Sequence, residues 1–209
     1  MMLIKKTVRS FVSELASDSA APGGGSASAL AGCLGAALTT MVCNLSLDEE
    51  KYKASLPEIL EIRAQASTLL EKLMLAIDAD ANAFKEVMNA YKLPKATDEE
   101  KSFRLETIQQ SMKKASLLPL SVAADCLEAL KLSHRILPIG NANAASDAAV
   151  AALMAYAAVQ GALFNVKINL GFIKDAEFCA ETRELIEEIS VTAKKENAAM
   201  EAAVAKIFP

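Results

Sequence analysis

Apolar residues recur every three or four positions along most of the chain, which is the spacing of amphipathic helices. This spacing predicts a first helix from Ile4 to Leu15. A breaker run with three glycines follows, and it opens into a helix of small residues from about Ser26 to Asn44. Along this second helix, small residues such as Gly35 form a smooth side that a neighbouring backbone can approach closely.

Capping residues and prolines delimit the later helices. Ser55 begins a capping box with Pro57 in the first turn, and Thr97 begins another. Pro119 is expected to kink or restart the helix that contains it. The helices predicted after the first two cover residues 55–91, 97–137, 147–171 and 176–207. Since nothing in the pattern indicates a strand, we expect an all-α fold: one domain, residues 1–209, forming a multihelical bundle of about six or seven helices, some of them long.

Composition and charge narrow the class of function. The chain has 209 residues, 53% of them hydrophobic and only 5% aromatic, which supports a packed core and excludes a disordered polymer. A net charge of −4 and the absence of a basic stripe argue against nucleic-acid binding. The four cysteines form no C-x-x-C pair, and the single histidine is His134. We therefore expect neither a metal site nor a disulfide framework.

Two stretches without charge, 19–47 and 148–166, reach the length of a membrane span and contribute to a mean hydropathy of +0.25. Small residues dominate both stretches, polar residues interrupt them, and acidic residues flank them instead of the positive charges that a span prefers. We therefore expect both to be buried in protein and not in a membrane. Without a recognisable secretory leader, the expected compartment is the cytoplasm.

One carboxylate interrupts the apolar side of the predicted helix 55–91. The apolar positions recur about every 3.6 residues from Ile62 to Tyr91, and Asp80 occupies one of them. Because an unpaired buried charge is costly, Asp80 must be paired, protonated or open to a cleft. A structural ion pair would account for it as well as a catalytic role would. Asp78 lies off this side and is predicted to be a surface charge.

The predicted helix 147–171 is polar at both ends. Asp147 lies in its first turn, and Asn165 and Lys167 lie near its end. An acidic first turn stabilises any helix, and a terminal lysine often extends into solvent, so each has an ordinary structural explanation. Asp147 and Asn165 are about 27 Å apart along one helix. They can contact the same small substrate only if two subunits pack antiparallel.

The glycine turn before the second helix offers free backbone N–H groups at the positive end of a helix. Such a turn suits a carboxylate or a phosphate, although a flexible turn is the simpler explanation. The residues of this candidate site are Gly23, Gly24, Gly25 and Ser26. Cationic candidates for binding an anionic tail are Lys92, Lys95 and Arg104.

Three motifs occur in a fixed order: APGGGSASALAG at 21–32, the stretch from Asp80 through Leu93-Pro94-Lys95, and GNANAASD at 140–147 followed by NVKIN at 165–169. Together they resemble the cyclodeaminase/cyclohydrolase family, which includes formiminotetrahydrofolate cyclodeaminase and a stand-alone methenyltetrahydrofolate cyclohydrolase. The similarity extends from residue 11 to residue 178. It implies an all-α, dimeric folate enzyme that lacks the fused formiminotransferase domain of the bifunctional relatives.

The resemblance implies cyclisation of 5-formiminotetrahydrofolate to 5,10-methenyltetrahydrofolate with release of ammonia. The alternative is hydrolysis of 5,10-methenyltetrahydrofolate to 10-formyltetrahydrofolate, and a remote alternative is a non-enzymatic helical adaptor. Both reactions place positive charge on N5, the bridging carbon and N10. A partly buried carboxylate would stabilise that charge and move the proton, with no metal and no cofactor beyond the folate.

This chemistry gives each candidate residue an expected role. Either Asp80 or Asp147 is predicted to be the catalytic carboxylate. The glutamate tail is expected at the turn Gly23–Gly25, with Lys95, Arg104 or Lys167. Candidates for hydrogen bonds to the pterin are Asn141, Asn143 and Asn165. The expected partners are a second copy of the chain and a separate formiminotransferase.

Overall fold

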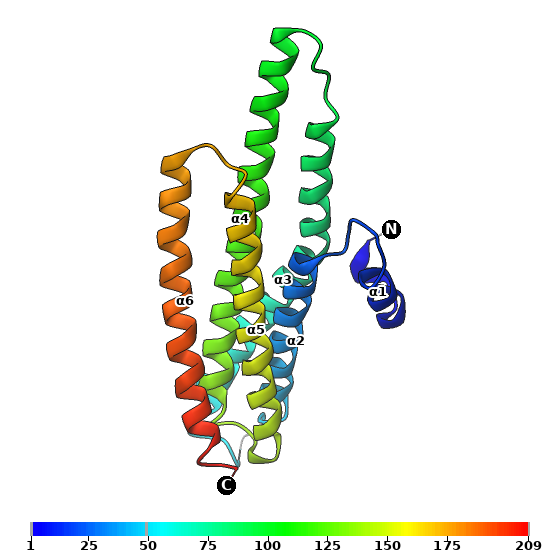
Figure 1. Cartoon of the computed structure of the whole chain (residues 1–209). Coiled ribbons are helices and arrows are strands. Elements are labelled where there is room, and N and C mark those ends of the chain that lie inside the picture. The colour runs from blue at the N-terminus through cyan, green and yellow to red at the C-terminus, as the bar shows by residue number, and fades with distance from the viewer. Residues whose placement is uncertain (1, 49, 209) are drawn as a thin grey trace.

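The computed structural model describes residues 2–48 and 50–208, and within these ranges all regular structure is helical (Figure 1). Six α-helices and two short 3-10 helices occur in this described part of the chain. They are η1 (Leu3–Lys5), α1 (Val8–Leu15), α2 (Gly24–Asn44), α3 (Leu56–Tyr91), α4 (Asp98–Ile136), η2 (Ala142–Ala144), α5 (Ala145–Leu170) and α6 (Ala176–Val204). The prediction of an all-α bundle is confirmed.

Helices α2 to α5 form the body of an elongated bundle, and α6 packs on α4 and α5 (Figure 1). The α3–α4 hairpin extends beyond the other helices, and α1 lies to one side. Because α2 runs opposite to both α3 and α5, its N-terminus lies level with the C-terminal halves of those two helices. The N-terminal half of α4 reaches the same level. This end of the bundle therefore brings together segments from four helices.

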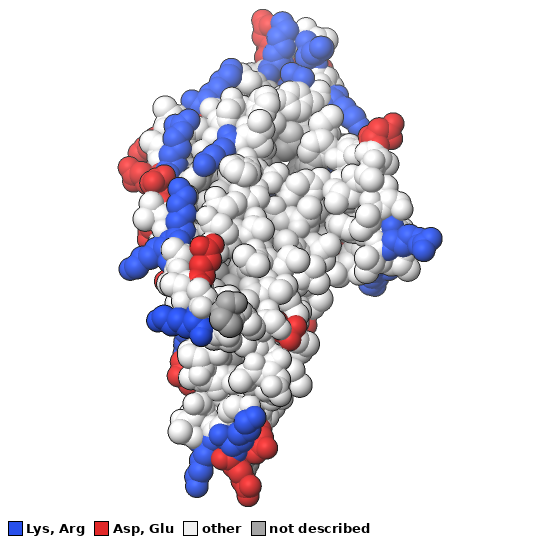
Figure 2. Space-filling model, turned by 60° about the horizontal axis from the view of Figure 1, so that its bottom comes forward, with Lys and Arg blue, Asp and Glu red and all other residues white. Residues whose placement is uncertain are grey.

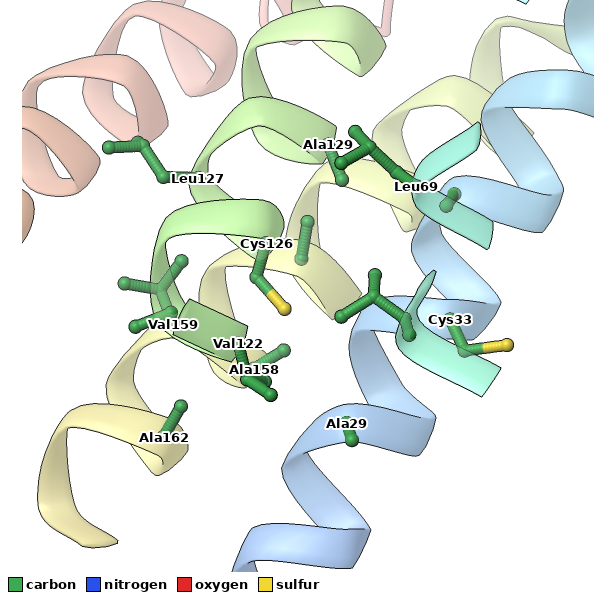
Figure 3. Close-up of a cluster of buried hydrophobic side chains, with 14 of the residues drawn as sticks. Ala29, Cys33, Leu69, Val122, Cys126, Leu127, Ala129, Ala158, Val159 and Ala162 are labelled. Atoms are coloured by element: carbon green, nitrogen blue, oxygen red, sulfur yellow. The ribbon is translucent and has the colours of Figure 1, made fainter. Parts of the chain in front are cut away.

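Small side chains allow α2 and α5 to approach closely. A Cβ atom added at Gly35 would lie only 2.9 Å from the backbone oxygen of Ala151, so no larger residue fits there without a shift. Figure 3 shows Ala29 of α2 and Ala158 of α5 in the core between the helices, beside Cys126 of α4. The contact between α2 and α5 is thus made by close backbone approach, as the smooth side of α2 predicts.

The ends and interior of the long helices follow the sequence signals only in part. At the start of α4, the Thr97 hydroxyl accepts from the Glu100 N–H and the Glu100 carboxylate accepts from the Thr97 N–H, which confirms that capping box. Ser55 makes no side-chain cap, so the box predicted there is wrong. Pro119 does not divide its helix, because α4 continues from Asp98 to Ile136.

Asp78 is not the surface charge that its position off the apolar side predicts. Its carboxylate accepts hydrogen bonds from the backbone N–H groups of Leu3, at 2.5 Å, and Ile4, at 3.2 Å. This contact holds the N-terminal segment against α3. The first α-helix consequently begins at Val8, four residues later than predicted, with Thr7 as its N-cap.

Two helical segments, Gly24–Asn44 and Ala142–Leu170, have the length and mean hydropathy of membrane-spanning helices. Of their most apolar windows, 50% and 44% respectively are buried inside the protein. The core helix of a water-soluble protein meets the same criteria of length and composition, and these two helices pack against each other at the centre of the bundle.

Candidate functional site

A cavity of about 460 Å³ opens at the level where the four helices meet. Its volume is in the range of small-molecule sites, about 300–1,000 Å³. The N-terminus of α2, the C-terminal half of α3, and parts of α4 and α5 form its walls. The lining residues are Ala20, Ala21, Gly23, Gly24, Gly25, Asp80, Ala81, Ala83, Phe84, Val87, Met88, Tyr91, Met112, Ala115, Asn165, Ile168, Asn169 and Phe172. We call this space the central cavity.

Asp80 is the only acidic side chain among these lining residues. The Ser26 hydroxyl lies 2.9 Å from Asp80 Oδ2 and 3.0 Å from the backbone oxygen of Ile77, so its single proton has two acceptors. Gly25 lies directly against the carboxylate, because an added Cβ would be 2.0 Å from Asp80 Oδ1. The carboxylate is therefore held between the first turn of α2 and its own helix.

Burial raises the pKa of Asp80 above its ordinary value. The Ser26 hydroxyl and backbone N–H oppose this rise, because both stabilise the ionised carboxylate. A carboxyl group with a raised pKa can gain and lose a proton more readily near neutral pH than an exposed one. Asp80 thus has the environment that acid–base chemistry requires.

The glycine turn has a different role from the one that its sequence suggests. α2 begins at Gly24, after a cis bond between Ala21 and Pro22, and Gly23 is its N-cap without a side-chain bond. The carboxylate at the positive end of this helix is that of Asp80 itself. The Asp80 carboxylate therefore already occupies the position that the sequence offered to an external anion.

Asn165 joins Asp80 in the central cavity, as a pterin-binding residue would. Its Nδ2 donates to the backbone oxygen of Gly161 at 2.8 Å, and Gly24 packs against its amide. Asn169, one turn further along α5, also lines the cavity. Sequence reasoning assigned no role to Asn169, although its spacing of four residues from Asn165 places both on one side of the helix.

Three other candidates lie at the opposite end of the bundle. Asp147 is half-buried in the first turn of α5, and it is not among the residues that line the central cavity. Asn141 donates to the backbone oxygen of Leu45 and accepts from the Asn143 N–H. These bonds tie the α4–α5 connection to the end of α2. Within one subunit, none of the three approaches Asp80.

The predicted cations for an anionic tail also lie outside the central cavity. Arg104 contacts a residue of the cavity wall, because its guanidinium donates a hydrogen bond to the backbone oxygen of Tyr91, which lines the cavity. Lys167 is exposed, with its ammonium 5.8 Å from the ring centre of Phe164. Lys95 is exposed in the α3–α4 connection.

A second cavity, of about 820 Å³, adjoins the first between α3 and the N-terminal segment. We call it the side cavity. The two cavities share Ala20, Ala21, Ala81, Phe84 and Met88 as lining residues. The polar side chains of α3 and its C-cap in the side cavity recur at helical spacing: Asp78, Asn82, Lys85, Asn89 and the C-cap Lys92. Of these, only Lys92 was a candidate from the sequence.

Some charged side chains in the side cavity have a partner, and others do not. Asp78 is occupied by the backbone of Leu3 and Ile4, and Glu14 pairs with Lys6. Within residues 2–48 and 50–208, Lys85 and Lys92 take part in no ion pair. Two unpaired ammonium groups therefore border this space, spaced by two helical turns.

The groups that a metal ion would need do not gather in the described part of the chain. No cluster of three or more His, Cys, Asp or Glu side chains occurs among those residues. The four cysteines are buried free thiols.

An antiparallel helical bundle with a substrate-sized cavity around one desolvated carboxylate defines an all-α enzyme equipped for acid–base chemistry. Comparison with known proteins makes the class specific. The sequence profile of the family described as formiminotransferase-cyclodeaminase matches residues 7–188, and the chain belongs to this family.

Individual relatives agree with this assignment. The chain is 39% identical over 182 residues to a methenyltetrahydrofolate cyclohydrolase of Methylorubrum extorquens, covering 87% of this chain and 88% of the relative. It is 36% identical to a formimidoyltransferase-cyclodeaminase of Gallus gallus, covering 94% of this chain. That match covers 36% of the Gallus gallus protein, so this chain spans about a third of the bifunctional relative.

The fold has a solved counterpart. The crystal structure of formiminotetrahydrofolate cyclodeaminase from Thermotoga maritima superposes with a TM-score of 0.86 at 27% identity, over 97% of this chain and 98% of the other. The predicted resemblance and the prediction of a folate one-carbon enzyme are confirmed at the level of the family. These relatives are enzymes, which leaves the adaptor alternative without support.

Proposed function

We propose that this protein cyclises 5-formiminotetrahydrofolate to 5,10-methenyltetrahydrofolate and releases ammonia. The observation that carries the proposal is the placement of Asp80: a half-buried carboxylate with a raised pKa in a cavity of ligand size. The cyclodeaminase from Thermotoga maritima, which this chain matches over nearly its full length, supports the same reaction.

Asp80 would act on the proton that the reaction must move. N10 of the folate attacks the protonated formimino carbon, and the tetrahedral adduct carries one proton too many on N10. The Asp80 carboxylate accepts this proton and delivers it to the amino group, which leaves as ammonia while N10 and N5 share the methenyl cation. The ionised carboxylate then lies beside that cation and stabilises it. No cofactor beyond the folate takes part in these steps.

The specific activity is tested with two substrates supplied separately. With 5-formiminotetrahydrofolate, the methenyl absorbance should rise and ammonia should appear in equal amount. If neither product forms at any enzyme concentration while methenyltetrahydrofolate is hydrolysed, the cyclodeaminase proposal is wrong. A separate formiminotransferase is the partner that we propose as the source of the formimino substrate.

The second candidate is the cyclohydrolase reaction. The relative from Methylorubrum extorquens is named for this reaction, and the match covers 87% of this chain and 88% of that protein. Here Asp80 would accept a proton from water as it adds to the methenyl carbon, and it would return that proton to N5 as the bond between this carbon and N5 breaks. The hydroxyl group of the adduct loses its own proton to solvent and becomes the carbonyl of 10-formyltetrahydrofolate. In this case the methenyl absorbance falls, in contrast to the rise expected for cyclisation. One site serves both reactions because they share the cation.

The side cavity is proposed to hold the anionic glutamate tail of the folate. Its shared wall with the central cavity allows one elongated ligand to occupy both. Lys85 and Lys92, seven positions apart on α3, lie about 10.5 Å from each other along the helix, and a chain of glutamates carries carboxylates over such a distance. The amides of Asn82 and Asn89 lie on the same side of α3.

Replacing Lys85 and Lys92 together with Gln is expected to raise KM for a polyglutamylated substrate about 3- to 10-fold, because each exposed ion pair contributes modestly. The value of kcat should not change, and the effect should weaken at high salt. Steady-state kinetics measure both, with Lys53→Gln, in the connection that precedes α3, as control. The same change at Lys95 tests the site expected from the sequence: a larger KM effect there than at Lys85 and Lys92 would contradict the side-cavity assignment.

A homodimer is proposed to form through the exposed side of α2 and α5. Both helices present apolar side chains there, and between positions 19 and 47 the chain carries no charge. Figure 2 shows one face of the protein whose broad central area lacks charged side chains. An uncharged surface of this kind is most simply covered by its own copy. The exposed apolar residues of this side are Leu34 and Met41 of α2, Leu45 directly after it, and Val150, Met154, Phe164 and Ile168 of α5.

The double variant Leu34→Glu and Met154→Glu is expected to convert the dimer to a monomer, because it places like charges in the proposed interface. Light scattering coupled to size-exclusion chromatography should give twice the chain mass of 22.1 kDa for the unchanged protein and one chain mass for the variant. Leu185→Glu on α6 is the matched control. A monomeric unchanged protein would refute the proposal.

A further inference from the structure

Pro119 leaves one backbone carbonyl of α4 without its helical partner. In an α-helix, each carbonyl accepts from the N–H four residues later, and proline has no N–H. The carbonyl of Ala115 therefore has no donor within α4, and the proline ring crowds it away from the helix axis. The helix nevertheless continues through this point, and Ala115 lines the central cavity.

Asn169 of α5 supplies the missing hydrogen bond. Its Nδ2 lies 2.8 Å from the backbone oxygen of Ala115. Only the nitrogen of the amide can donate there, so this bond fixes the orientation of the side chain. Asn165 is fixed in the same way, by the bond from its Nδ2 to the oxygen of Gly161.

The two fixed amides each retain an acceptor oxygen, Oδ1. Among the described residues, neither Oδ1 atom receives a hydrogen bond, and both side chains line the central cavity. The pterin ring of a tetrahydrofolate carries several N–H donors, on its 2-amino group and on ring nitrogens. Two acceptors one helical turn apart suit the donor edge of such a ring.

We propose that Asn169 binds the pterin ring by accepting hydrogen bonds from its N–H groups, and that Pro119 is a positioning residue that orients Asn169 by freeing the Ala115 carbonyl. The inference rests on the proposed function, because the folate is the ligand. It adds a binding residue on α5 and gives a reason for a proline in the interior of α4.

A proline with only a structural role predicts a different outcome from a positioning proline. Alanine at this position restores the N–H to the Ala115 carbonyl and removes the ring, which favours the helix. The carbonyl then turns back along the axis of α4, and Asn169 loses its partner. A structural proline would change stability alone, whereas a positioning proline couples a gain in stability to a loss of binding.

The test is Pro119→Ala, measured by thermal unfolding, by steady-state kinetics and by calorimetric titration with tetrahydrofolate. We expect Tm to rise by about 2 °C or more. We expect KM and the Kd of tetrahydrofolate to rise about 5- to 10-fold, the equivalent of one lost hydrogen bond, with kcat within about twofold. Pro57→Ala, in the first turn of α3, is the matched control and should leave Kd unchanged.

Asn169→Leu tests the binding residue directly and keeps the inference testable if Pro119→Ala does not fold. It should raise Kd to a similar extent, and the double variant should be no worse than the single ones. If the unchanged protein binds tetrahydrofolate and both variants bind it equally well, the inference is overturned while the proposed function stands. If the unchanged protein binds no folate, the proposed function fails and the inference fails with it.

Discussion

Replacing Asp80 with Asn is expected to lower kcat for methenyl formation about 10²- to 10⁴-fold, the usual contribution of a positioned acid–base group. Asparagine has nearly the same shape and can still bond to Ser26, so KM should change little. Stopped-flow or steady-state measurement of the methenyl absorbance gives both constants. Asp147→Asn distinguishes the two carboxylates predicted from the sequence. If neither variant changes the rate, the carboxylate mechanism is wrong.

The same variant has a predicted effect on stability with a definite sign. Because burial raises the pKa of Asp80 in the folded state, the folded protein binds this proton more tightly than the unfolded chain does. Stability from this group is greatest below the unfolded pKa, and it decreases as pH rises toward the folded pKa. Asp80→Asn removes that decrease. Urea unfolding should therefore show the variant to be at least as stable as the unchanged protein at pH 7. The difference in the free energy of unfolding between the two proteins should be smaller in acid.

Gly25→Ala is expected to lower kcat about 100-fold. The new Cβ would lie 2.0 Å from Asp80 Oδ1, so the carboxylate must move away from Ser26. A displacement of about 1 Å at a reacting group can cost about 10²-fold in rate. The comparison is Gly23→Ala, where an added Cβ has no neighbour within 4 Å. We expect this second variant to lose less than about threefold.

Kinetics at several pH values separate displacement from general damage in Gly25→Ala. A displaced carboxylate changes the pH at which kcat falls, whereas partial unfolding lowers activity equally at every pH and lowers Tm. Equal losses in Gly25→Ala and Gly23→Ala would mean that the turn itself, and not its contact with Asp80, limits the reaction.

The spacing of apolar residues was sufficient to predict the helices and to single out the catalytic candidate in α3. The period of apolar residues predicts α2 to α6 within a few residues, and the position of Asp80 on the apolar side of α3 points to the cavity. Such features depend on residues close together in sequence. The same logic succeeded at the Thr97 capping box, where both partners lie within one turn.

Features that depend on contacts between distant segments could not be predicted in this way. Asp78 was read as a surface charge because its partners, Leu3 and Ile4, lie more than 70 positions away. The role of Asn169 depends on a carbonyl 54 positions earlier. The proposed tail site uses Lys85 and Lys92 in place of Lys95, because only the fold shows which cations border a cavity.

The central cavity and the side cavity border different sides of helix α3. One side of the helix presents Asp80 and Val87 to the central cavity, and the side that carries Lys85 borders the side cavity. Under the proposed placement of the tail, substitutions on the second side are expected to change which folate chain lengths are preferred while Asp80 and its surroundings stay unchanged.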